Sequence, residues 1–186
     1  MGLYTLAHST IPAFIRSYSS VFLSSSYPLK SEPLFGATGS IVNSLELSWC
    51  NFKNVGDEYT RLEKISQITR ILKNKSLRVC WKSRNGINCC NCEKCSRTII
   101  GLYICGANVK SYGFNITMDW FNNLKNEIIK YTFPAINDWL EMKEYIKSNA
   151  ELVNDDNVNW IIDFDFIKIH EYNSNRKNMT KRITNW

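Results

Sequence analysis

The sequence predicts an α/β protein whose N-terminal half carries short strands of a parallel sheet and whose C-terminal half is helical. Three observations favour this fold class: a strand–helix–strand order between residues 45 and 81, helical apolar spacing from residue 98 onward, and four cysteines with metal-ligand spacing. A chain of 186 residues is long enough to bury a core without disulfide bonds.

The N-terminal segment predicts two strands joined through a long loop. Residues 3–16 have the apolar content of a helix interrupted at Pro12, and Ser20–Ser24 reads as a short buried strand. Residues 24–40 contain Pro28, Pro33, Gly36 and Gly39, which predicts a long loop. A loop of this length inside a domain is typically functional. Leu45–Trp49 alternates with period two, which favours a second strand.

A helix and a further strand follow. Thr60 and Glu63 have the spacing of a capping box, and apolar residues behind them recur every three or four positions, which predicts a helix over Arg61–Lys73. Leu77–Trp81 reads as a short strand. Strand, helix and strand in this order predict a parallel βαβ unit.

The C-terminal half predicts helices. Thr98–Ile104 is a helical run that ends before Gly106, and Met118–Lys130 and Ala135–Ser148 each carry one apolar face. Trp160–Ile169 is compatible with a strand or with a last helix, and periodicity alone does not decide between them.

The strongest functional signal is the cysteine content. The seven cysteines are Cys50, Cys80, Cys89, Cys90, Cys92, Cys95 and Cys105. An odd count without a secretory leader argues against a disulfide framework and favours the cytoplasm. Cys80, Cys89, Cys92 and Cys95 are separated by eight, two and two residues, so their thiolates are expected to converge on one structural Zn²⁺.

Other interpretations of these cysteines stay open. Thiolates also bind iron–sulfur clusters, and the four side chains are alternatively free or buried cysteines. Cys90 is an alternative ligand to Cys89, although Cys89 alone keeps both two-residue gaps. Cys50 and Cys105 are expected to be small core residues.

The chain is mildly basic, with 23 Lys and Arg residues, 17 Asp and Glu residues and a formal charge of +6. Lys82, Arg84, Lys94 and Arg97 surround the cysteines. They either offset the charge of a four-thiolate metal site or hold an anionic substrate or a nucleic-acid phosphate beside it. Residues 173–186 are basic, carry no acid and predict a polar tail. No apolar run approaches the ~18 residues of a membrane span, so no membrane partner is expected.

The cysteine region resembles a known family. Cys80 with Trp81, the run from Asn88 to Thr98 (NCCNCEKCSRT) and Gly106 are similar to the C-terminal region of the PP-loop ATP pyrophosphatase superfamily, in particular to the 7-cyano-7-deazaguanine synthase family. The resemblance spans roughly residues 20–114. It implies half of a Rossmann-like domain of the PP-loop or HUP type over residues 1–114, with the zinc motif at residues 80–95. A helical extension over residues 115–172 would follow. Ser24 and Ser25 would contact the substrate.

The departures from the family pattern limit the expected activity. The family's Ser-Gly-Gly-x-Asp-Ser loop, which serves ATP-dependent adenylation, is absent, and Cys90 stands where the family usually has glycine. Arg97 follows Cys95 by two residues instead of three. The resemblance therefore implies the metal-bearing half of such a protein, which is inactive alone. It would act with a second chain that carries the ATP loop, or as a homo-oligomer. Alternatively, it is a degenerate form of the family.

The residues leave one alternative function open and disfavour another. A non-catalytic zinc knuckle that binds nucleic acid or a protein partner is the alternative. A hydrolase is disfavoured, because His8 and His170 are the only histidines and no Gly-x-Ser-x-Gly elbow is present.

Overall fold

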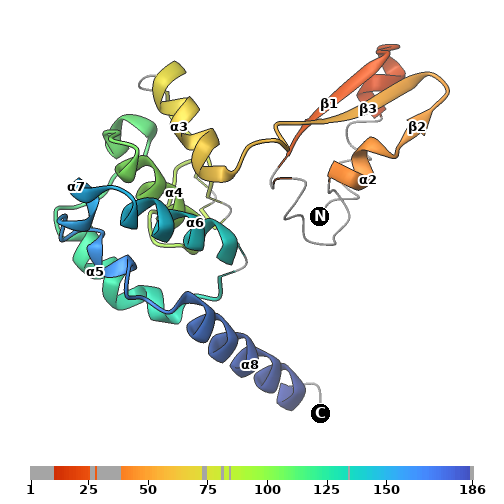
Figure 1. Ribbon diagram of the computed structural model, residues 1–186. Helices are drawn as coiled ribbons and strands as arrows, with labels where there is room; N and C mark the ends of the chain where they lie inside the picture. Colours follow the sequence, from red (N-terminus) through yellow and green to blue (C-terminus); the bar gives the residue numbers. More distant parts are fainter. Residues whose placement is uncertain are drawn as a thin grey trace. The chain divides into compact units, whose positions relative to one another are not determined.

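A computed structural model describes residues 11–25, 28, 39–72, 75–80, 82–83, 85–133 and 135–184, with the backbone alone for residues 46 and 177–184. Residues 3–10 of the expected first helix, most of the 24–40 loop and Arg84 lie outside the described residues. The chain forms two compact units, Met1–Lys64 and Ile65–Trp186 (Figure 1). The division lies within helix α3 (Arg61–Ile71), earlier in the chain than residue 114.

The first unit is built on a mixed three-stranded sheet in the order β1-β3-β2. The expected strand at β1 (Ser20–Ser24) is confirmed, and it pairs in parallel with β3 (Cys50–Val55), so that Ser20 faces Asn51 and Ser24 faces Val55. At the other edge of β3 lies the short antiparallel strand β2 (Glu46–Leu47).

One expected strand is wrong in its bounds. In place of a single strand over Leu45–Trp49, Ser48 and Trp49 form the two-residue turn of a hairpin that joins β2 to β3. The apolar–polar alternation continues through the turn, so the sequence pattern does not mark the reversal. The register pairs Leu47 with Cys50 across it.

Alternate residues of these strands face a small core. Cys50 and Phe52 of β3 are buried with Val42 of helix α2 (Gly39–Asn43) and with Ala13, which lies in a helical turn over residues 11–15. Partly buried side chains close the cluster: Val21, Leu23 and Leu45. The period-two pattern of the strands thus places their apolar side chains on one face of the sheet.

Helix α3 begins at the expected capping box. Thr60 N–H donates to Glu63 Oε2 at 2.7 Å, and Glu63 N–H donates to Thr60 Oγ1 at 3.2 Å, which satisfies two backbone donors of the first turn. The helix prediction is confirmed through Ile71.

The expected strand over Leu77–Trp81 is wrong, and so is the βαβ unit that depended on it. Residues 75–80 run extended, but they pair with no strand among the described residues. Leu77 N–H donates instead to Tyr112 O at 2.9 Å, and the Asn88 side chain takes further backbone groups of this segment. The fold is therefore mixed α/β, with its one parallel strand pair among the described residues formed by β1 and β3.

The second unit is helical in its described residues, as expected. Its elements are α4 (Glu93–Ile104), η2 (Val109–Tyr112), α5 (Trp120–Glu127), η3 (Ile128–Lys130), α6 (Ile136–Lys147), α7 (Ala150–Val153), η4 (Asn159–Ile161) and α8 (Phe166–Thr184). Gly106 ends α4 with φ of +75°, a left-handed conformation that favours glycine. The segment 160–169 is η4 and the start of α8, and the 173–184 backbone continues α8 as helix.

Helix α6 is the centre of this unit, because it packs against α4, α7 and α8 (Figure 1). Its Trp139 is fully buried and stacks on Phe166 of α8, with ring centroids 5.2 Å apart. Phe133 meets both rings edge-on, at 5.8 Å from Trp139 and 5.3 Å from Phe166. Trp139 also donates to Glu93, the first residue of α4, so this aromatic core contacts the end of α4 at which the clustered cysteines lie.

Candidate metal centre

Four sulfur atoms of the second unit converge. The Sγ atoms of Cys80, Cys89, Cys92 and Cys95 all lie within 4.8 Å of one another, and those of Cys89 and Cys95 are 3.9 Å apart. The 3.9 Å distance far exceeds a disulfide bond of about 2.05 Å, and all four cysteines are free thiols. Cys80, Cys92 and Cys95 are buried, whereas Cys89 is half-buried. The cluster can therefore hold a metal ion.

Helix α4 positions two of the sulfurs. Cys92 is the N-cap residue of α4, and Cys95 lies in its first turn with no exposed surface. The positive end of a helix dipole favours thiolates at this position. The helix begins at Glu93, five residues earlier than its apolar pattern predicts, because the cysteine segment supplies the first turn.

Asn88 joins the Cys80 segment to the rest of the site. Its buried amide oxygen accepts from the N–H groups of Val79 at 3.1 Å and Cys80 at 3.2 Å. Its amide nitrogen donates to Leu77 O at 2.7 Å and to Gly113 O at 3.2 Å. One side chain thus replaces the partner strand that residues 77–80 lack, and it fixes Cys80 beside Cys89.

Arg78 holds the loop between the first two cysteines from outside. Its guanidinium donates to Ile87 O at 2.7 Å and to Ser83 O at 2.6 Å. Ser83 N–H in turn approaches Cys80 Sγ at 3.4 Å. Arg78 thus joins Ser83 and Ile87, two described residues of the segment between Cys80 and Cys89.

The sulfurs differ in how readily they ionise. Burial opposes ionisation of the Cys80 thiol, but backbone hydrogen bonds from Ser83 and Cys89 outweigh it and lower its pKa to about 5. Burial raises the pKa of Cys92 and of Cys95, and negative charge on neighbouring sulfurs raises each further. Four thiolates in this space therefore require a cation among them.

Cys90 lies outside the sulfur cluster. Its backbone has φ of +57°, a left-handed conformation in which glycine is unstrained. Its buried Sγ approaches Asn88 O at 3.7 Å, and its carbonyl accepts from the Trp120 indole N–H at 2.9 Å. The structure thus gathers Cys89, and not Cys90, with the other three cysteines.

Side chains of later elements bind the same loop and helix. The Tyr131 hydroxyl lies 3.1 Å from Ser96 Oγ and donates to Asn91 O at 3.2 Å. The Trp139 indole N–H donates to Glu93 Oε1 at 2.9 Å, which links the site to α6. Asn88, Trp120 and Tyr131 carry no sequence signal for this role, because each acts through tertiary contacts.

Three of the four cations near these cysteines are described, and their environments differ. Lys82 is exposed, whereas Lys94 is half-buried. Arg97 is buried and paired with Asp138 of α6 and with Glu93, so its charge is used within the fold and we no longer assign it to anion binding. Ser24 is exposed at the end of β1, and Ser25 N–H donates to Val55 O at 2.8 Å. Both serines belong to the first unit, and the four cysteines of the sulfur cluster belong to the second.

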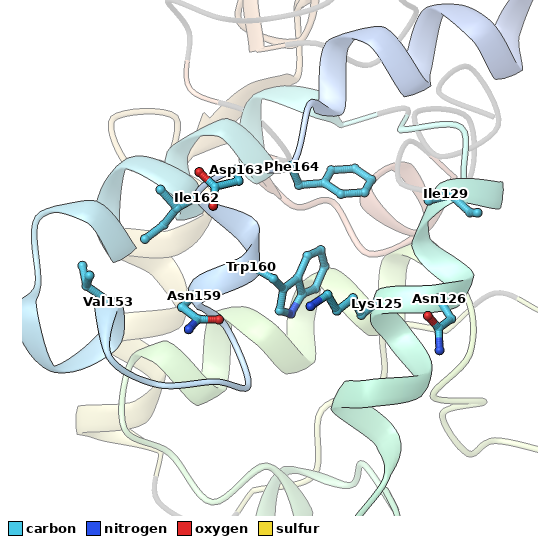
Figure 2. Close-up of a pocket in the computed structure, with 9 residues that line it drawn as sticks. All are labelled: Lys125, Asn126, Ile129, Val153, Asn159, Trp160, Ile162, Asp163 and Phe164. Atoms are coloured by element: carbon cyan, nitrogen blue, oxygen red, sulfur yellow. The ribbon is translucent and has the colours of Figure 1, made fainter.

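Two cavities of the second unit lie near α5. One, of about 480 Å³, borders Cys89 and is lined by polar side chains that include Asn115 and Asn123. The other, of about 790 Å³, is lined by the rings of Trp160 and Phe164 together with Lys125 (Figure 2). The first cavity alone touches a cysteine of the sulfur cluster.

Comparisons with known proteins return no relative. No protein-family model, no curated protein sequence and no solved structure matches the chain. Among the described residues, no helix combines the length and the apolar composition that a membrane span requires.

Proposed function

We propose that the chain is a zinc protein in which one Zn²⁺, held by Cys80, Cys89, Cys92 and Cys95, stabilises the second unit. The convergence of the four sulfurs within 4.8 Å carries this proposal. A tetrahedral site with Zn–S bonds near 2.3 Å places its sulfurs about 3.8 Å apart. The 3.9 Å between Cys89 and Cys95 agrees with that spacing.

The same spacing favours a single ion over an iron–sulfur cluster. In a four-iron cluster each thiolate binds a different iron, so the sulfurs stand on the outside of a larger body. The described cluster of sulfurs leaves room for one ion at its centre. A lone iron would satisfy the same geometry, so elemental identity is the property to measure.

The proposed zinc is structural. Four protein thiolates fill a tetrahedral ion and leave no position for water or substrate. Three of the four sulfurs are buried, and the surrounding contacts from Asn88, Trp120 and Tyr131 belong to the fold of the second unit. Metal binding and folding of this unit are therefore coupled.

For the wider role, we propose the metal-bearing part of a PP-loop ATP pyrophosphatase-like protein that depends on a second chain for its ATP loop. The motif resemblance supports this role, together with the exposed Lys82 and the half-buried Lys94, which lie close in sequence to the metal-binding cysteines. Adenylation of an acid would then need the backbone N–H cradle of the second chain, which this sequence does not supply.

Cobalt substitution tests the metal proposal. Co²⁺ bound by four thiolates in a tetrahedral site gives intense charge-transfer and ligand-field absorption. We expect a single saturating equivalent for the wild-type chain and a weaker, shifted spectrum for Cys92→Ser. Cys90→Ser is the matched control and should leave the spectrum unchanged. An altered spectrum for Cys90→Ser with an unaltered one for Cys92→Ser would overturn the ligand assignment.

Pyrophosphate release tests the wider role. The chain alone, incubated with ATP and a panel of carboxylic acids, is expected to release no pyrophosphate. Robust release by the isolated chain would show that it carries its own ATP site and would contradict the dependence on a second chain.

A further inference from the structure

We propose that Cys89 is a modification site of the metal centre. Among the four sulfurs, it is the one that small uncharged alkyl halides, such as iodoacetamide, alkylate first. The inference rests on the proposed zinc site. The Cys89 thiolate would attack the carbon, the carbon–halogen bond would break, and the halide would leave with its electron pair. The product is a thioether, a neutral and weaker ligand than the thiolate it replaces.

Access distinguishes Cys89 from the other three sulfurs. Cys80, Cys92 and Cys95 are 6%, 2% and 0% exposed, and none of them lines the cavity of about 480 Å³. Cys89 is half-buried and forms part of that cavity's wall. An electrophile that enters the cavity therefore meets Cys89 before any other sulfur of the cluster.

The cavity wall determines which electrophiles fit. The amides of Asn91, Asn115 and Asn123 and the hydroxyl of Thr117 offer hydrogen bonds to an uncharged polar group. Glu127 is the charged side chain of the lining, and Lys130 pairs with it at 2.6 Å and offsets its charge. A four-thiolate zinc site carries a formal charge of about −2. The charge of the metal site repels an anionic reagent, so an amide reagent should enter more readily than a carboxylate of the same size.

Two other thiols of the second unit compete with Cys89. Cys90 lines the same cavity but is only 6% exposed, and its Sγ approaches Asn88 O at 3.7 Å. Cys105 is the second competitor. It is half-buried and lines a separate cavity of about 600 Å³ with Arg70 and Tyr145, outside the sulfur cluster. Burial raises the pKa of the Cys105 thiol above its ordinary value, so this side chain is protonated at neutral pH. A metal-bound sulfur is already a thiolate, and the thiolate is the reactive form.

The test is limiting iodoacetamide on the purified chain whose zinc content has first been measured, followed by peptide mapping. We expect the first carboxamidomethyl group on Cys89, and release of zinc to a chromophoric chelator with the same time course. Iodoacetate should react about tenfold more slowly than iodoacetamide, because the negative charge of the metal site repels its carboxylate. First modification at Cys90 or at Cys105, or equal rates for the two reagents, would overturn the proposal.

A pair of variants tests the route through the cavity. Asn123→Phe narrows the cavity from an exposed position of α5 without touching a sulfur, and it should slow alkylation several-fold with zinc retained. Met118→Phe, at a position that is 95% exposed and outside the lining, is the control and should react at the wild-type rate. Equal rates for the two variants would contradict the route. A sample without zinc at the outset would instead refute the proposed metal site.

Discussion

Replacing Asn88 by aspartate removes two hydrogen bonds from the metal loop with almost no change of shape. The carboxylate still accepts from Val79 and Cys80, but it no longer donates to Leu77 O and Gly113 O, which the amide reaches at 2.7 and 3.2 Å. Asn88 is only 9% exposed, so neither water nor another side chain readily replaces the lost donor.

The size of the effect follows from those two carbonyl groups. A buried polar group left without a partner costs about 1–3 kcal/mol, and a hydrogen bond of 3.2 Å is the weaker of the pair, so we expect a loss of about 3 kcal/mol in unfolding free energy. The new negative charge lies next to Cys80 and disfavours ionised thiolates, which should also weaken metal binding.

Urea denaturation of the metal-loaded proteins measures the loss, and competition with a chromophoric chelator measures the change in zinc affinity. Asn122→Asp is the matched control, because Asn122 is exposed on α5 and the same substitution there should change stability by less than about 0.5 kcal/mol. If Asn88→Asp were as stable as Asn122→Asp and bound zinc equally well, the role assigned to Asn88 would be wrong.

Three further substitutions test the contacts around the site. Cys90→Gly should stay within about 1 kcal/mol of wild type in urea denaturation and retain zinc, because the left-handed backbone at φ of +57° suits glycine; a loss of zinc would mean that Cys90 is a ligand. Trp120→Phe should lose about 1 kcal/mol, because the indole donor to Cys90 O disappears, and no loss would show that this bond is unimportant. Arg97→Gln should cost about 3 kcal/mol, because it leaves the buried Asp138 carboxylate without its cation. Arg97→Met combined with Asp138→Leu should recover most of that loss, and a double variant as unstable as the single one would argue against the ion pair as the cause.

Local patterns predicted well the parts of the fold that depend on nearby residues. The capping box at Thr60 and Glu63 starts α3 because its two hydrogen bonds span three residues. The cysteine spacing predicted the convergence of the sulfurs for the same reason, since two-residue gaps at the start of a helix return side chains to one point. Gly106 ended α4 as expected, because a left-handed C-terminal residue is a local requirement.

The failures depend on contacts between distant residues. Leu77–Trp81 has strand-like composition, but its backbone groups are bonded by the Asn88 side chain and by Tyr112 O. Neither partner can be deduced from the pattern of residues 77–81. The sequence left open whether Arg97 offsets the charge of the metal site or holds an anion, and its pairing with Asp138 depends on the packing of α6 against α4.

The central claim is that four thiolates of this chain hold one zinc ion. Elemental analysis of protein purified without added metal tests this claim most directly. We predict one equivalent of zinc per chain, bound through Cys80, Cys89, Cys92 and Cys95. Iron with a visible absorption band, or less than about half an equivalent of any metal, would contradict it.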